Sequence, residues 1–136
     1  MDSSPTPAWP QIADEARCPC LSGDTYGLCC APLHRGDPAP SAERLMRSRY
    51  SAFVLGLADY LLDTWHPTTR PESLQLDSGI RWFRLDILSR RNGILPHSRG
   101  EVEFSAHFRD GSDVGTQHEV SEFLKQDGRW FYVASV

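Results

Sequence analysis

The chain has 136 residues, of which 40% are hydrophobic and 24% are charged, a composition typical of one soluble globular domain with a small appendage. Its formal net charge of −4 argues against DNA binding, because proteins that neutralise phosphates are usually basic. No apolar run is long enough to span a membrane, and the N-terminus lacks a signal-peptide pattern. We therefore expect a cytoplasmic protein with reduced thiols, and the composition favours no particular oligomeric state.

The first segment, residues 1–17, contains Pro5, Pro7 and Pro10 and few apolar side chains. A segment of this composition buries too little apolar surface to offset the loss of chain entropy on ordering. We therefore expect a flexible lead-in over these residues, as is common at chain termini.

All cysteines of the chain lie between residues 18 and 30, in the pattern C-x-C, eight residues, then C-C. Gly23 and Gly27 allow the intervening loop to turn tightly. Four thiolates gathered by such a loop are the ligands that a tetrahedral structural zinc site requires. The sequence therefore predicts one structural Zn(II) bound by Cys18, Cys20, Cys29 and Cys30.

Other uses of these thiols are less favoured. A disulfide between adjacent cysteines strains the intervening peptide, and nothing marks the chain as secreted. A nucleophilic cysteine needs a free thiolate, whereas a bound metal would occupy all four sulfurs. The proline-rich linker over residues 31–40 contains His34, which could replace one sulfur ligand. With four thiolates present, His34 is expected at the surface.

An amphipathic helix is predicted over residues 41–57, with Ser41 as its N-cap and Gly56 at its end. Arg49 lies within the apolar face of this helix, so its guanidinium must find hydrogen-bond partners there. The apolar stripe consists of Leu45, Met46, Tyr50, Phe53, Val54 and Leu57. The arginines off the stripe, expected in solvent, are Arg44 and Arg47.

Two shorter helical segments follow this helix. Asp59 can cap a helix over residues 60–65, and Pro67 ends it. A third short helical turn is predicted over residues 71–76, ending near Gly79.

From Ile80 onwards the apolar period changes from 3.6 to 2, which predicts β-strands. In the first strand, Phe83, Leu85 and Ile87 alternate with Trp82, Arg84 and Asp86, so the two sets are expected on opposite faces. Further strands are expected over residues 102–109, 116–125 and 129–134. The turn signals between them are Asn92-Gly93, Asp110-Gly111 and Asp127-Gly128.

The cysteine segment resembles the SEC-C motif, the small zinc module named for the C-terminal tail of the SecA translocation ATPase. Besides the cysteines, the resemblance rests on Ser22-Gly23 and Tyr26. Leu21 stands where the motif has a glycine, and Asp24 and Thr25 stand where it usually has lysines. Since that basic surface is implied in binding an acidic chaperone of SecA, the same partner is not expected here.

The rest of the chain resembles the domain of the bacterial YchJ-like family, which has a nuclear transport factor 2-like fold. The resemblance implies an α+β fold in which a curved antiparallel sheet forms a cone around helices, as helices followed by strands also indicate. The expected organisation is a flexible segment (1–17), a zinc knuckle with its linker (18–40) and a cone-shaped domain (41–136). The matching segments are LMRSRYSA at 45–52, TWHP at 64–67, VEF at 102–104 and DGRW at 127–130.

A ligand site in a cone-shaped fold would lie between the helices and the sheet. The resemblance places Glu119 and Ser121 on the inward face of the third strand. We expect Arg49 and Glu119 to meet there as a hydrogen-bonded ion pair, because a buried arginine usually has a carboxylate partner. Trp65 and His66 are the other pocket candidates, and His66 with Glu119 would form a general-base pair if both faced one cavity.

Two functions fit these features. The favoured one is a zinc-stabilised binding module whose knuckle contacts a protein or ribosomal partner, because SEC-C motifs are associated with translation and secretion machinery and no catalytic set is recognisable. The alternative is a small-molecule or enzymatic pocket in the cone, of the lyase, isomerase or hydrolase kind, as in other proteins of this superfamily. Loss of partner capture on zinc removal would favour the first, and a deep, water-accessible cavity lined by Arg49, Glu119, Trp65 and His66 would favour the second.

Overall fold

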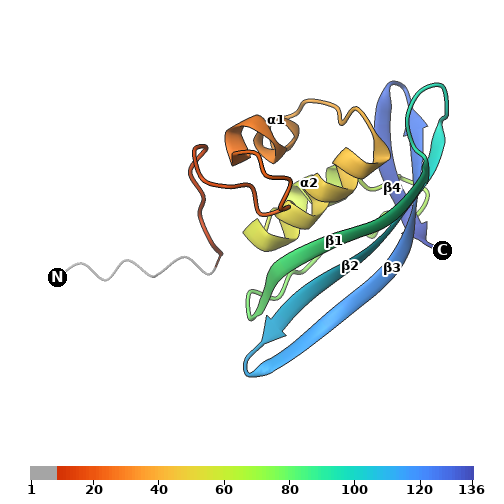
Figure 1. The fold of residues 1–136 in the computed structure, drawn as a ribbon. Helices are drawn as coiled ribbons and strands as arrows, with labels where there is room; N and C mark the ends of the chain where they lie inside the picture. Colours follow the sequence, from red (N-terminus) through yellow and green to blue (C-terminus); the bar gives the residue numbers. More distant parts are fainter. Residues whose placement is uncertain (1–8) are drawn as a thin grey trace.

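The fold is a curled antiparallel sheet with its helices on the concave side (Figure 1). The structure is a computed structural model and describes residues 9–136. Its elements are a 3-10 turn η1 (Tyr26–Leu28), helices α1 (Cys30–His34), α2 (Ala42–Leu55) and α3 (Ala58–Asp63), and strands β1 (Ile80–Asn92), β2 (Arg99–Asp110), β3 (Asp113–Gln126) and β4 (Arg129–Ser135). The strands lie in the order β1-β2-β3-β4. This arrangement confirms the expected α+β class. Across residues 9–136, no helix combines the length and apolar character that crossing a bilayer requires.

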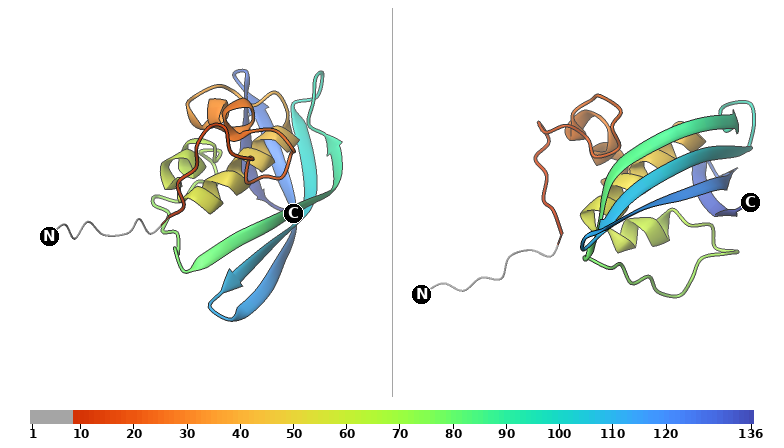
Figure 2. Two further views of the ribbon diagram at one scale, coloured as in Figure 1. Left: turned by 60° about the vertical axis from the view of Figure 1, so that its left-hand side comes forward. Right: turned by 60° about the horizontal axis from the view of Figure 1, so that its bottom comes forward.

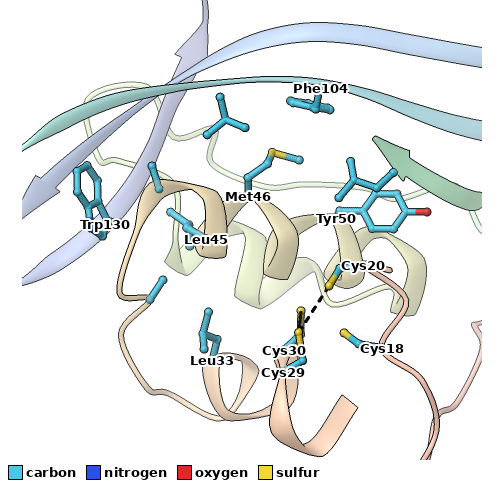
Figure 3. Packing of buried hydrophobic residues seen from close by; sticks show 14 of the residues in the cluster. Cys18, Cys20, Cys29, Cys30, Leu33, Leu45, Met46, Tyr50, Phe104 and Trp130 are labelled. Atoms are coloured by element: carbon cyan, nitrogen blue, oxygen red, sulfur yellow. Dashed lines mark hydrogen bonds between the residues drawn. The ribbon is translucent and has the colours of Figure 1, made fainter. Parts of the chain in front are cut away.

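Helix α2 lies in the middle of three layers. The sheet covers one of its sides, and the cysteine loop with α1 covers the other (Figures 1 and 2). The helix is therefore buried on more than the single apolar stripe seen in the sequence. Its buried residues are Ala42, Leu45, Met46, Ser48, Arg49, Tyr50, Ser51 and Ala52. Figure 3 shows Leu45, Met46 and Tyr50 in one cluster with Phe104 of the sheet and with the cysteines.

The ends of α2 follow the expected capping chemistry. The hydroxyl of Ser41 accepts a hydrogen bond from the backbone N–H of Arg44 at 3.1 Å, which satisfies one of the free donors of the first turn. Gly56 ends the helix in the left-handed conformation, with φ 74°. Both predicted helix boundaries are therefore confirmed.

The segments after α2 differ from prediction. Helix α3 begins after Leu57, so Asp59 lies in its first turn and not at its N-cap. Residues 71–76 contain no helix. Their side chains are exposed or half-buried, and a short helix without a buried face gains too little from packing to offset the cost of nucleation.

Strand β1 differs from the predicted alternation because it contains two β-bulges. The first lies between Trp82 and Arg84, and the second between Ile87 and Ser89. Each bulge adds one residue to the strand and reverses which side chains face the core. Trp82 consequently packs against the core together with Leu85 and Ile87 of the other predicted set, whereas Phe83 is 44% exposed.

The turns between strands also differ in length. Asp127 and Gly128 have φ values of 53° and 80° and join β3 to β4 directly, as a two-residue hairpin requires. Asn92 also has a positive φ, of 55°, but β2 begins only at Arg99. The Asn-Gly signal therefore marks the end of β1 correctly and leads into a longer loop.

Residues 9–17 lie against the cysteine loop and α2, in contrast to the expected flexible lead-in. The backbone N–H groups of Tyr26 and Gly27 donate to the carbonyls of Ala16 and Asp14, at 2.8 and 2.9 Å. Trp9 packs directly over Gly56, where a β-carbon on the glycine would overlap the indole ring. The part of the predicted lead-in formed by residues 1–8 lies outside the described residues.

The Trp9–Gly56 contact predicts a difference between two glycine substitutions. Gly56→Ala and Gly128→Ala both force alanine into the left-handed region, which costs about 1–2 kcal/mol. Only at Gly56 does the new methyl group also meet a side chain, since nothing lies within 4 Å of the corresponding position at Gly128. Chemical denaturation should therefore show a larger loss of unfolding free energy for Gly56→Ala, by about 1–3 kcal/mol.

A double-mutant cycle supplies the control. In a Trp9→Ala background, Gly56→Ala should cost about as much as Gly128→Ala, because only the backbone strain remains. An unchanged excess at Gly56 in that background would show that Trp9 does not pack there.

Candidate functional site

The cysteine loop, residues 17–30, folds through short-range hydrogen bonds. Arg17 and Thr25 form an isolated antiparallel bridge that closes the loop at its base. The N–H of Leu21 donates to the carbonyl of Cys18 at 3.1 Å, which turns the chain between the first two cysteines. The last two cysteines lie where η1 passes into α1, and the bent backbone at Cys29, with φ −121° and ψ −93°, lets adjacent side chains point to one place.

The four sulfurs form one buried cluster. They all lie within 4.8 Å of one another, and no cysteine is more than 2% exposed. Sγ–Sγ distances are 3.6 Å between Cys20 and Cys29 and 3.9 Å between Cys29 and Cys30. In a tetrahedral zinc–thiolate site, with metal–sulfur bonds of about 2.3 Å, the sulfurs lie about 3.8 Å apart. The donor type, number and spacing thus fit a four-coordinate metal ion, which this cluster could hold.

The thiols strongly influence one another's protonation. Hydrogen bonding, first with Cys18 and then with Cys30, lowers the pKa of the Cys20 thiol. Burial raises the pKa of Cys29 to about 11, and hydrogen bonding with Cys18 and Cys20 raises the pKa of Cys30. The shifts have opposite directions because a charge on one sulfur disfavours charge on the sulfurs beside it. A metal ion would replace the thiol protons, so that all four sulfurs could carry charge.

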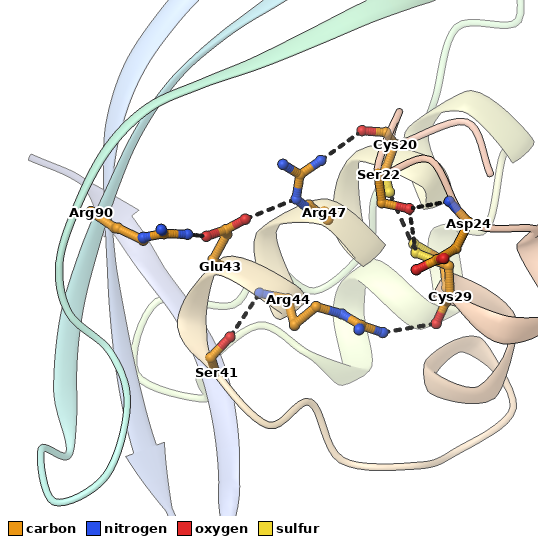
Figure 4. Close-up of polar contacts among 10 residues, drawn as sticks. Cys20, Ser22, Asp24, Cys29, Ser41, Glu43, Arg44, Arg47 and Arg90 are labelled. Carbon is orange, nitrogen blue, oxygen red and sulfur yellow. Dashed lines mark hydrogen bonds and ion pairs between the residues drawn. The ribbon is translucent and has the colours of Figure 1, made fainter.

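Two serine hydroxyls lie against the sulfurs. Ser51, fully buried on α2, donates to Cys30 Sγ at 3.3 Å and lies 3.7 Å from Cys18 Sγ. Ser22 of the loop lies 3.1 Å from Cys29 Sγ (Figure 4). A hydroxyl group that hydrogen-bonds to a ligand sulfur stabilises the negative charge of the thiolate. Groups that hydrogen-bond to metal ligands commonly have this role.

Arginines of α2 bind the backbone of the loop, although the sequence placed them in solvent. Arg44 donates to the carbonyl of Cys29 at 3.0 Å, and Arg47 donates to the carbonyl of Cys20 at 2.9 Å. Glu43 accepts hydrogen bonds from both Arg47 and Arg90 of β1 (Figure 4). The backbone carbonyls of the loop accept hydrogen bonds from these two arginines. The periodicity of the helix alone does not reveal such partners, because they belong to another segment of the chain.

His34 is neither a metal ligand nor a free surface residue. Its Nδ1 lies 2.6 Å from the hydroxyl of Tyr26, and its Nε2 lies 2.8 Å from the backbone carbonyl of Ser48. Its ring also packs edge-on against Tyr60. Burial lowers the pKa of this imidazole, so the neutral form, which accepts from the tyrosine and donates to the carbonyl, is favoured. His34 thereby joins the cysteine loop to α2.

Leu21 occupies an unusual backbone conformation. Its φ of 64° lies in the left-handed region, where a leucine is strained and glycine is not. This is the position where the SEC-C motif has a glycine. The side chain is 55% exposed, so packing does not account for the leucine. Leu28, on the other arm of the loop, is 77% exposed.

A second candidate site is a cavity of about 230 Å³ between α2 and the concave face of the sheet. Arg49, Trp65, Glu119 and Ser121, four of the five pocket residues expected from the sequence, lie around it. Half of its lining residues are aromatic: Tyr50, Phe53, Trp65, Trp82, Phe104 and Tyr132. The cavity is therefore largely apolar, with a few polar groups facing it.

The expected ion pair between Arg49 and Glu119 is not formed. Arg49 Nη1 donates instead to the carbonyl of Leu61 and the hydroxyl of Thr64, both at 2.7 Å, and no carboxylate of residues 9–136 forms an ion pair with it. Its guanidinium lies over the rings of Trp65 and Tyr132, 5.3 and 4.6 Å from their centroids. Helix α3 ends beside α2, so its free carbonyl takes the role that the sequence gave to a carboxylate.

Glu119 finds its partners on its own strand. Its carboxylate accepts hydrogen bonds from the hydroxyl of Ser121 and the amide of Gln117. Ser121 is fully buried and Glu119 half-buried, so the inward face of β3 is the one that the resemblance implied.

His66 lies outside the cavity. Its Nδ1 is 2.7 Å from the hydroxyl of Thr68, and its Nε2 is 2.7 Å from the side-chain oxygen of Gln126. The backbone of His66 also pairs with Tyr132. These contacts tie the segment after α3 to β4, and they leave no general-base pair with Glu119.

The residues that sequence reasoning missed are mostly small or lie off the apolar stripe. Ser48, Ser51 and Ala52 form a second face of α2, at the helical spacing i, i+3, i+4. Small side chains at this spacing let a second layer approach the helix closely. That spacing was the available signal for Ser51, whereas no local pattern identifies the partners of Arg44 and Arg47.

The two parts of the chain match two family models. Residues 41–135 match the model described as YchJ, middle NTF2-like domain, and residues 16–32 match the SEC-C motif. The chain is 50% identical to a UPF0225 protein of Corynebacterium efficiens over 87% of this chain and 91% of that protein. It is 51% identical to a UPF0225 protein of Streptomyces coelicolor, over 85% and 90% of the two chains.

Two solved structures share the fold. The solution structure of a SEC-C motif containing protein from Rhodopseudomonas palustris has a TM-score of 0.75 and 37% identity, covering 88% of this chain and 96% of the other. The crystal structure of a SEC-C motif containing protein from Psychrobacter arcticus has a TM-score of 0.72 and 28% identity, covering 89% and 82%. The chain therefore belongs to the YchJ-like family of UPF0225 proteins, with a SEC-C motif ahead of its NTF2-like domain.

Proposed function

We propose that this protein is a zinc-stabilised binding module, in which a structural Zn(II) holds the cysteine loop against α2 and the loop contacts a protein or ribosomal partner. The observation that carries the metal assignment is the closed cluster of four buried sulfurs within 4.8 Å of one another. Tetrahedral sulfur sites select zinc or iron, and a closed site whose ligands fill every position is typical of structural zinc. Four free cysteines in one cluster require a reducing compartment, so the proposal places the protein in the cytoplasm.

The metal is expected to stabilise the whole fold. The four cysteines belong to the same buried cluster as Leu45, Met46, Tyr50 and Phe104, so the loop and the sheet share one core through α2 (Figure 3). Metal-binding free energy in such a site is also folding free energy.

Removal of the metal should therefore destabilise α2 as well as the cysteine loop. Protein purified under reducing conditions should contain one zinc per chain by elemental analysis, and chelation should lower its thermal midpoint and speed amide hydrogen exchange in α2. Absence of stoichiometric metal, or iron in its place, would overturn the assignment. If exchange rose only within residues 17–30, the loop would be a separate appendage.

Substitution of Ser51 tests whether its hydrogen bond to a ligand sulfur strengthens zinc binding. Ser51→Ala removes the hydroxyl that donates to Cys30 Sγ and should weaken zinc binding about 10- to 100-fold in competition with a chromogenic chelator. The matched control is Ser48→Ala, one helical turn away, because the Ser48 hydroxyl bonds Tyr60 and the carbonyl of Leu45 and touches no sulfur. Equal zinc affinity in the two variants would contradict a role for Ser51 at the metal.

The proposed partner surface is the outer side of the cysteine loop. Leu21 and Leu28 each adjoin a cysteine, and the sulfurs of those two cysteines are 3.6 Å apart, so both leucines come from one end of the loop. A strained, exposed leucine where glycine would be relaxed points to a role for the side chain outside folding. Asp24 is the single charged residue between them, so an apolar anchor with neutral or basic surroundings would complement this surface.

Substitution at Leu21 separates folding from partner binding. Leu21→Gly relieves a backbone strain of about 1–2 kcal/mol and adds chain entropy worth about 0.5–1 kcal/mol to the unfolded state, so stability should be unchanged or higher. Capture of proteins from separated ribosomal and soluble fractions should nevertheless fall for Leu21→Gly and for Leu28→Ala. Leu88→Ala on β1, where the leucine is similarly exposed at 53%, is the control and should capture what the unsubstituted protein does.

The outcomes of this experiment distinguish the loop from the rest of the surface. If the loop variants and Leu88→Ala retain the same set of captured proteins, the cysteine loop is a structural element and not a docking surface. A lower stability of Leu21→Gly would show that the leucine serves the fold.

A further inference from the structure

We propose that the cavity between α2 and the sheet binds a small aromatic or apolar carboxylic acid that also carries a hydroxyl group. In this arrangement the ligand carboxylate lies toward Arg49 and Trp65, and its hydroxyl donates to Glu119. The site is separate from the cysteine loop, so the inference does not depend on the proposed metal or partner.

The first observation is a buried cation without an anion in contact. Arg49 is 4% exposed, and within residues 9–136 its hydrogen-bond partners are a backbone carbonyl and a hydroxyl, both neutral. A buried charge is costly unless an opposite charge compensates it. Burial accordingly lowers the pKa of Arg49 to about 10. Glu119, which also lines the cavity, acts on Arg49 only at a distance, and a ligand carboxylate would place a negative charge in direct contact with the guanidinium.

The second observation is an unpaired donor in the wall. The indole Nε1–H of Trp65 is buried and has no hydrogen-bond partner among the described residues. Leaving a buried donor unsatisfied costs about 1–3 kcal/mol. Since an indole N–H only donates, the group that would satisfy it is an acceptor. Trp65 and Arg49 contact each other and both line the cavity, so one acceptor group could serve both.

Glu119, a polar residue on the opposite wall, indicates which group the other end of the ligand carries. Both oxygens of the Glu119 carboxylate already accept a hydrogen bond, from Ser121 and Gln117, and an acceptor has a second lone pair for a ligand O–H. A cationic ligand fits less well, because the guanidinium of Arg49 would repel it and already lies over Trp65 and Tyr132. The other walls are aromatic or apolar, and about 230 Å³ accommodates a body the size of one aromatic ring.

Titration of the full chain, as purified under reducing conditions, with 4-hydroxybenzoate tests the charge requirement. Nuclear magnetic resonance should show saturable shifts confined to α2, α3 and the concave face, with binding at least tenfold tighter than that of 4-hydroxybenzyl alcohol, which has the same ring without the carboxylate. Equal binding of the alcohol, or no binding of 4-hydroxybenzoate, would overturn the proposal.

Two tryptophan variants test the placement. Trp65→Phe removes the unpaired donor while keeping a ring, and should weaken 4-hydroxybenzoate binding about tenfold, as expected for a lost hydrogen bond to a charged group. Trp130→Phe is the matched control, because Trp130 also has a buried, unpaired Nε1 but does not line this cavity. Equal losses in the two variants would contradict the assignment.

Two further variants test the cavity itself and its acceptor. Ala106→Leu extends a wall residue into the space and should abolish binding, with the fold checked by the same spectra. Glu119→Gln should weaken 4-hydroxybenzoate several-fold and leave unsubstituted benzoate unchanged. Binding that survives Ala106→Leu would place the probe on the outer surface and overturn the proposal.

Discussion

The contact between the four sulfurs and the small-residue face of α2 is the constraint on which the rest of the structure depends. Ser51 reaches Cys18 and Cys30, and Arg44 and Arg47 hold the loop carbonyls, so the loop is bonded to the helix at several points. Because α2 also packs into the curled sheet, the cysteine cluster and the sheet share one core. The two family motifs of the chain therefore pack around the same helix.

Helix α2 presents different chemistry to its two neighbours. Toward the loop it presents hydroxyl groups and arginines, which suit thiolates and free carbonyls. Toward the sheet it presents Met46, Tyr50 and Phe53, together with Arg49, around an apolar cavity. A fourteen-residue helix buried on both sides leaves little room for substitution, because a change on one face is transmitted through close packing to the other.

Two features are locally unfavourable and lie at the proposed binding surfaces. Leu21 takes a left-handed backbone conformation, and Trp65 leaves a buried donor unpaired. Local strain and unsatisfied groups persist when the surrounding structure overdetermines them, and they concentrate where a protein binds something. In this fold the hydrogen-bonded loop holds Leu21, and the pairing of residues 64–66 with Tyr132 holds Trp65.

The sequence by itself determined the α+β class, the capped helix from Ser41 to Gly56, the run of strands after Ile80 and the grouping of the cysteines, because period, capping and turn chemistry are local properties. Only the tertiary structure decided the partner of Arg49, since the end of α3 supplies a carbonyl that no local pattern locates. It also decided that Trp82 faces the core, which depends on a β-bulge, and that His66 lies outside the cavity. These features depend on which backbone groups remain unpaired after packing, and that is a property of the whole fold.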